Sequence, residues 1–254
     1  MGLLALKLTI TPAVIALATL AARRFGPAVG GWLVGLPLTC APVVLFVALE
    51  RSSRFAAHVS TGAVAGVTAE VAFVLAYVTA ATRGWGWLRS LAVATATFVA
   101  VGAAVERAHA PLPVLLASAI ASLLVGLRVV PRMRRTAWPQ TRWELPLRIV
   151  LGTSLVLAVT GFAALLGPGV SGIATTYPLI TTTLAVFVHR AAGAEAAVAV
   201  YRGLLLGMFA LTAFAATLVL VLTRLPLGAA FVLALALTAT AQLGSLPVVR
   251  RAHA

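Results

Sequence analysis

Apolar runs of about 20 residues, each long enough to cross a bilayer as a helix, recur along the whole chain. Short segments that carry arginine separate these runs, as in loops that flank membrane spans. Hydrophobic residues make up 62% of the sequence and charged residues only 9%, a balance that is not that of a soluble domain. The pattern predicts an all-α, polytopic membrane protein whose immediate partner is the lipid bilayer.

We predict nine transmembrane helices from these runs. They are expected at 3–22, 28–49, 56–82, 85–105, 112–130, 145–166, 169–188, 196–222 and 227–249. The second contains Pro37 and Pro42, and we expect both to interrupt it because proline lacks the backbone donor that a helix needs.

An internal duplication relates the two halves of the chain. The segment that begins at Gly26 returns at Gly167, and at the same offset of 141 residues Pro37-Leu38 returns as Pro178-Leu179. Glycine and proline at fixed spacing constrain the backbone, so these matches weigh more than apolar ones. Further glycines match at that offset: Gly31 with Gly172, Gly62 with Gly203, and Gly66 with Gly207.

The duplication divides the chain into three parts. Residues 1–105 form a first four-helix repeat, 106–142 a linker helix with a basic cytoplasmic loop, and 143–254 a second four-helix repeat. Five crossings separate the starts of the two repeats, so equivalent helices must point in opposite directions. The prediction is a pair of inverted-topology repeats, an arrangement found in many secondary transporters.

Basic residues mark one face of this predicted arrangement. Arg23-Arg24, Arg83, the basic loop and Arg250-Arg251 all fall on the same side of nine spans. By the positive-inside rule that side is cytoplasmic. We therefore expect a multi-pass protein of the bacterial inner (cytoplasmic) membrane, with its N-terminus outside and its C-terminus in the cytoplasm. The basic residues that produce the net charge of +14 lie between spans and form no stripe on a soluble face. Nucleic acid is therefore not an expected partner.

The two proline breaks supply the chemistry for a site. Pro37 and Pro178 each free a backbone carbonyl inside a span, which is tolerated only in a protein interior or beside a wet cavity. Candidate substrate-binding residues are Pro37, Thr39 and Cys40 in one half, Thr175, Thr176, Tyr177, Pro178 and Thr181 in the other, and Gln242 in the ninth span. The alternative is that the threonines bond carbonyls of their own helices and repair the kinks.

Glu70 is a candidate proton-coupling residue. It lies near the middle of the third span, where a carboxyl is costly and marks a functional site by default. Gly62, Gly66 and Glu70 are four residues apart and share one helix face, and a Gly-xxx-Gly pair lets a neighbouring backbone approach. Glu70 is therefore expected to point into the bundle. The alternative is a permanently protonated glutamate that hydrogen-bonds across that interface.

Enzymatic chemistry is not expected. The chain has no aspartate, no paired carboxylates, no His/Glu motif with metal-ligand spacing and no glycine-rich phosphate loop. We therefore predict no catalytic residues, no metal site and no cofactor.

The repeated motif resembles a known family. Gly172, Pro178, Leu179, Phe187 and His189 follow the form G-x-x-x-x-x-P-L and then apolar residues ending in F-x-H, and Gly31, Pro37, Leu38 and Phe46 follow it in the first half. The motif resembles the small four-helix GlpM-like inner-membrane proteins, which implies a fused pair of such units and no assigned activity. The fused pair also resembles the drug/metabolite transporter pattern, but Lys7 and Pro12 stand where its small multidrug members have a first-helix glutamate.

The sequence favours a secondary transporter for a small polar or amphipathic solute, with its site between the two proline-broken helices. The alternative from another class is a non-transporting membrane scaffold or accessory subunit. Substrate and direction are not predicted, and assembly as a homodimer stays open.

Overall fold

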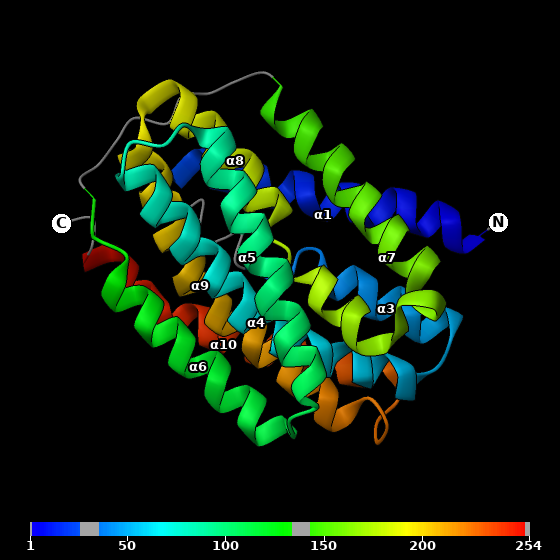
Figure 1. Cartoon of the computed structure of the whole chain (residues 1–254). Helices are drawn as coiled ribbons and strands as arrows, with labels where there is room; N and C mark the ends of the chain where they lie inside the picture. Colours follow the sequence, from blue (N-terminus) through cyan, green and yellow to red (C-terminus); the bar gives the residue numbers. More distant parts are fainter. Residues whose placement is uncertain (1, 26–35, 134–142, 252–254) are drawn as a thin grey trace.

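The computed structural model describes residues 2–25, 36–133 and 143–251, which form helices joined by short turns (Figure 1). The described helices are α1 (Gly2–Phe25), α3 (Cys40–Glu50), α4 (Ser53–Thr82), α5 (Trp87–Ala108), α6 (Leu112–Val129), α7 (Glu144–Thr175), α8 (Leu179–Ala192), α9 (Ala194–Val221) and α10 (Leu227–Arg251). No strand occurs in these ranges, and the predicted all-α class is confirmed.

Six of the described helices, α4, α5, α6, α7, α9 and α10, are long and apolar enough to cross a membrane. The apolar stretches of α1, α3 and α8 are shorter. Large apolar side chains cover outer faces, among them Leu165, Val232 and Leu243, which are more than 60% exposed. The chain is a multi-pass membrane protein, because lipid and not water is the solvent that such a surface needs.

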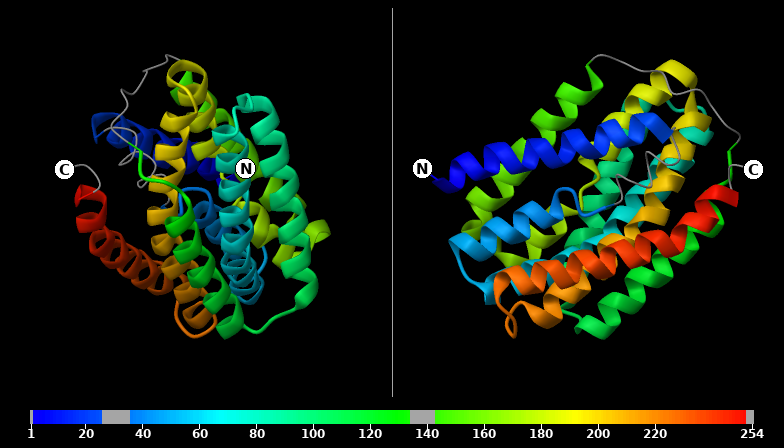
Figure 2. Two further views of the ribbon diagram at one scale, coloured as in Figure 1. Left: turned by 60° about the vertical axis from the view of Figure 1, so that its left-hand side comes forward. Right: turned by 180° about the vertical axis from the view of Figure 1, so that it is seen from behind.

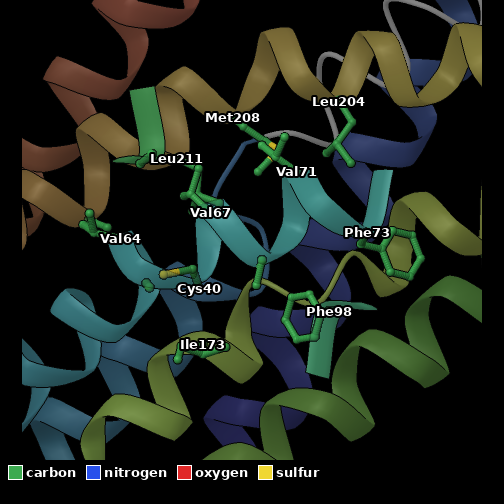
Figure 3. Close-up of a cluster of buried hydrophobic side chains, with 14 of the residues drawn as sticks. Cys40, Val64, Val67, Val71, Phe73, Phe98, Ile173, Leu204, Met208 and Leu211 are labelled. Atoms are coloured by element: carbon green, nitrogen blue, oxygen red, sulfur yellow. The ribbon is translucent and has the colours of Figure 1, made fainter. Parts of the chain in front are cut away.

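Helices α4 and α9 form the centre of the bundle. In the most apolar stretch of each helix, 72% of the residues of α4 and 67% of those of α9 are buried. The corresponding share is 22% in each of α5, α6 and α10. Helices α3, α5, α6, α7, α8 and α10 pack against this pair, and α1 packs against α7 and α3 (Figure 2). In the core between them, Val64, Val67 and Val71 of α4 face α9 (Figure 3).

The spans that contain the proline motifs differ from the prediction. Residues 169–188 do not form one helix, because α7 ends at Thr175 and α8 begins at Leu179. The first part of that predicted span continues α7 beyond a kink at Gly167, whose φ of 75° is one that glycine adopts without strain. Of the predicted span 28–49, residues 28–35 lie outside the described ranges, and α3 begins at Cys40. Pro42 does not interrupt α3, because it sits in the first turn, where no backbone donor is required.

Glycines bring α4 and the last part of α7 into backbone contact. A side chain at Gly62 would collide with the Gly169 carbonyl, and one at Gly172 with the Val59 carbonyl. Small residues permit such an approach between helices in a membrane. The Gly-xxx-Gly pair that was predicted to admit a neighbouring backbone has this neighbour in α7.

The short helices α3 and α8 each follow a proline break and are the half-helices of the bundle. Their C-terminal ends, which lie farthest from the breaks, are held by different contacts. At the end of α3, Glu50 pairs with Lys7 of α1 at 2.6 Å, and the Lys7 ammonium also donates to the Thr160 hydroxyl at 2.9 Å. At the end of α8, the His189 Nδ1 atom lies 3.0 Å from the Tyr77 hydroxyl of α4. Each half-helix is thus anchored to the bundle at the end that points away from the centre.

The turns gather at two opposite ends of the molecule. One end holds the turns after α3, α5 and α9, and the other holds the turns after α4 and α8 together with the ends of α6 and α10 (Figure 1). Helix α1 begins at the end of the molecule opposite to that at which α10 ends (Figure 2).

The substitution Gly62→Ala tests the contact between α4 and α7. The new methyl group would force the backbones apart, and overpacking of this kind costs roughly 1–3 kcal/mol, or about 3–10 °C in Tm. Circular dichroism of the detergent-solubilised protein would measure this. Gly161→Ala is the control, because that position on α7 has no neighbouring atoms for a methyl group to meet. Equal Tm values for the two variants would contradict the contact.

Candidate functional site

A small central cavity lies between the two proline breaks. Its volume is about 30 Å³, which is room for about two water molecules. The lining comes from both breaks and from the middles of α4 and α9: Leu36, Pro37, Leu38, Thr39, Glu70, Thr175, Thr176, Tyr177, Pro178, Leu179, Ile180, Thr181, Leu204, Met208 and Leu211. Segments more than a hundred residues apart in the sequence therefore share one cavity.

Both breaks make the same backbone hydrogen bonds. The Leu179 N–H donates to the Tyr177 carbonyl at 2.7 Å, and the Leu38 N–H donates to the Leu36 carbonyl at 2.6 Å. Pro178, with φ −76° and ψ 52°, is the centre of an inverse γ-turn, which such a bond closes. The proline carbonyls also accept matching hydrogen bonds at the starts of the helices that follow. The Ala41 N–H donates to the Pro37 carbonyl at 2.9 Å, and the Thr182 N–H donates to the Pro178 carbonyl at 2.7 Å.

Four threonines line the cavity, and the hydroxyl hydrogen atoms of Thr39, Thr175 and Thr176 are already used in hydrogen bonds. The Thr175 hydroxyl donates to the Gly172 carbonyl at 2.6 Å, and the Thr176 hydroxyl to the Ile173 carbonyl at 2.8 Å. Thr39 does not cap its own helix, and its hydroxyl donates to the Thr175 carbonyl at 2.9 Å. Thr175 and Thr176 thus bond carbonyls of their own helix, while their oxygen atoms keep lone pairs for a ligand.

Glu70 contributes the carboxyl of the lining. It is 3% exposed, and its Oε2 atom has no hydrogen-bond partner in the described part of the chain. The lining contains no lysine, arginine or histidine. Burying an unpaired carboxylate is costly, so its charge has to be met by a proton or by a cation that enters the cavity.

The part of the lining that α9 contributes is apolar. Leu204, Met208 and Leu211 project from α9 toward α4 (Figure 3). Leu211 stands at the repeat position equivalent to Glu70, just as Ile180 is equivalent to Thr39. The lining is therefore amphipathic: α4 contributes an acid, the two proline breaks contribute hydroxyls, and α9 contributes only apolar side chains.

Eight predicted residues line this cavity together: Pro37, Thr39, Glu70, Thr175, Thr176, Tyr177, Pro178 and Thr181. Cys40 is buried in the first turn of α3, directly beside the lining residue Thr39. Gln242 is buried on α10 and is not part of the lining. Sequence reasoning missed the apolar wall of α9, although the repeat offset pointed to it, since Leu211 is the partner of Glu70.

Tyr177 lines the cavity but its hydroxyl bonds elsewhere. The oxygen lies 2.9 Å from the Thr95 hydroxyl of α5, and the ring packs edge-on against Phe98 and Phe73 at centroid distances of 5.2 and 5.7 Å. Tyr177 thus fixes the break against α5 and α4.

A site for a transition metal is not formed by the described residues, since no three His, Cys, Asp or Glu side chains gather among them.

The substitution Thr39→Val tests the link between the two breaks. It removes the bond from α3 to the Thr175 carbonyl and leaves a buried acceptor short of a donor, which costs about 1–3 kcal/mol. We expect a Tm lower by several degrees and faster maleimide labelling of the adjacent Cys40. Thr97→Val is the control, because that exposed hydroxyl bonds only its own helix. Unchanged labelling of Cys40 in Thr39→Val would show that the bond does not hold the breaks together.

Comparisons of the chain with protein-family models, with curated proteins and with solved structures find no match. The GlpM-like resemblance therefore stays a prediction. The site combines a buried carboxyl whose Oε2 atom has no partner among the described residues, acceptor oxygens and apolar side chains of α9, where the two proline breaks meet.

Proposed function

We propose that this chain is an ion-coupled secondary transporter that carries a small polar or amphipathic solute across the cytoplasmic membrane. The observation that carries the proposal is Glu70, a buried carboxyl without a hydrogen-bond partner at Oε2 among the described residues, on the wall of a central cavity. Discontinuous helices near the midplane are where many secondary transporters hold substrate and coupling ions. Glu70 is the coupling group, because its charge must be neutralised inside the membrane.

The proposed architecture is a pair of inverted repeats. Several features support it at the offset of 141 residues: α4 and α9 begin at the equivalent residues Ser53 and Ala194, and both proline breaks make the same hydrogen bonds. Equivalent helices are also buried to similar extents. The counterpart of the last part of α7 would be residues 26–34, which lie outside the described ranges.

The cavity corresponds to a closed state of the transporter. Room for about two water molecules is too little for most organic solutes, so a solute enters only when α3 moves away from α4 or α8 moves away from α9. The half-helices are suited to such a movement, since each is anchored at its C-terminal end and follows a γ-turn at the cavity. Movement of one repeat against the other would open the site to one face at a time.

The second candidate is a membrane scaffold, which the small cavity volume favours. In that case the duplication serves packing alone, and the breaks never open. The two candidates differ in whether solvent reaches the cavity, and Cys40 reports this because it is the only cysteine in the chain.

Labelling of Cys40 by a membrane-impermeant thiol reagent distinguishes the candidates. In proteoliposomes we expect slow labelling of the native chain without denaturant, and suppression by a transported solute from a panel of amino acids, amines, sugars and nucleosides. Arg224→Cys in a Cys40→Ala background is the positive control, since this residue is exposed in the turn after α9. Labelling only after denaturation would favour the scaffold.

The substitution Glu70→Gln separates coupling from folding. It preserves the shape of the side chain and removes its charge, so we expect normal folding and a loss of ion-driven solute accumulation of at least tenfold. Glu195→Gln is the matched control, because this exposed carboxyl in the first turn of α9 is remote from the lining. Unimpaired accumulation in Glu70→Gln would remove Glu70 from the coupling mechanism.

We further propose that the N-terminus lies outside and the C-terminus in the cytoplasm. The positive-inside rule supports this orientation, and the start of α1 and the end of α10 lie at opposite ends of the molecule. A green fluorescent protein fused to the C-terminus should fluoresce, and alkaline phosphatase fused there should be inactive. Active phosphatase at the C-terminus would reverse the orientation.

A further inference from the structure

The size of the central cavity limits what can occupy it in the closed state. About 30 Å³ admits about two water molecules. A small ion with part of its water shell fits such a space, whereas a metabolite does not. The closed cavity is therefore suited to the coupling ion, and the solute requires the opened one.

The hydroxyl groups of the lining offer acceptors. The hydrogen atoms of Thr39, Thr175 and Thr176 are committed to backbone carbonyls at 2.6–2.9 Å, so their oxygens present only lone pairs. Thr181 also lines the cavity, and its hydroxyl makes no hydrogen bond to the described residues. Oxygen lone pairs are the ligands that hard cations take.

Glu70 decides the sign of the charge at the site. The last turn of α7 contributes about half a negative charge, and the starts of α3 and α8 about half a positive charge each, so the three helix ends together leave about half a positive charge. This is less than the full negative charge of an ionised Glu70, and no basic side chain in the lining balances the rest, so the site stays net negative. The approach of Thr176 to Gly66 places that hydroxyl against α4 one helical turn from Glu70.

A bound cation satisfies this site better than a proton does. A protonated Glu70 is neutral but has a single O–H group, so it can engage at most one of the lining oxygens. A cation instead uses the carboxylate and the hydroxyl oxygens together. One carboxylate matches a single positive charge, since divalent cations gather several carboxylates or waters.

We propose that the central cavity binds one sodium ion between the Glu70 carboxylate and the threonine oxygens, and that this ion drives transport. The inference rests on the proposed function in taking the cavity as the working site. Sodium binding itself is an equilibrium property, so it is measured without any transported solute.

Binding of radioactive sodium to the purified full chain in detergent tests the proposal. We expect saturable binding of about one ion per chain, no competition by potassium or choline, and a Tm raised by about 2–4 °C at sodium concentrations roughly five times Kd. Glu70→Gln should abolish binding, and Glu195→Gln should keep it. Thr181→Val, which removes one oxygen without breaking a bond to the described residues, should weaken binding at least tenfold, and Thr97→Val should not.

Absence of sodium binding, or equal binding by Glu70→Gln and the native chain, would overturn the proposal. Stabilisation that follows pH and is indifferent to sodium would assign a proton to Glu70 and overturn it as well. A chain that binds sodium at Glu70 but never labels at Cys40 supports the ion site while refuting the transporter. Solute accumulation that is unaffected by sodium refutes the proposal that this ion drives transport and leaves the transporter standing.

Discussion

The contact between α4 and the last part of α7 is the interaction on which the site depends. Gly62, Gly169 and Gly172 let the two backbones touch, so that no side chain separates them. This proximity places Thr176 against Gly66, one turn from Glu70, and seats the break after Thr175 in the middle of the bundle. With larger residues at these positions, the threonine oxygens and the carboxyl would belong to separate surfaces. Close helix packing thus creates the polar wall of the cavity.

The two proline breaks share a hydrogen-bonding pattern and differ in their side chains. Each break contains a γ-turn around a proline, in which the N–H of the residue after the proline donates to the carbonyl of the residue before it. At the offset of 141 residues Glu70 corresponds to Leu211 and Thr39 to Ile180, and all four residues line the cavity. Equivalent positions thus carry an acid and a hydroxyl in the first half of the chain, and apolar side chains in the second.

The sequence predicted those features that glycine, proline and charge determine. Apolar length predicted the helices, the two proline motifs predicted the breaks, and the rarity of intramembrane carboxyls predicted Glu70 as a cavity residue. It did not predict that α7 would continue through the kink at Gly167, because a Gly-Pro pair was taken as the end of a span. The sequence also could not decide whether the Thr175 and Thr176 hydroxyls donate to carbonyls of α7 or to a ligand, because side-chain rotamers depend on packing. The predicted interruption of a helix at Pro42 was wrong, because the effect of a proline depends on how many helical residues precede it, and only two precede Pro42 in α3.

The different anchors of the two half-helices have an energetic consequence. The end of α3 is held by an ion pair with Lys7, and the end of α8 by a hydrogen bond between two groups without formal charge, Tyr77 and His189. Separating a partly buried ion pair costs more than breaking a neutral hydrogen bond when the separated charges stay in a low-dielectric surrounding without a partner. Moving the end of α3 away from α1 would therefore cost more free energy than moving the end of α8 away from α4. If the molecule rocks, the conformation in which α8 has moved would be the more populated of the two.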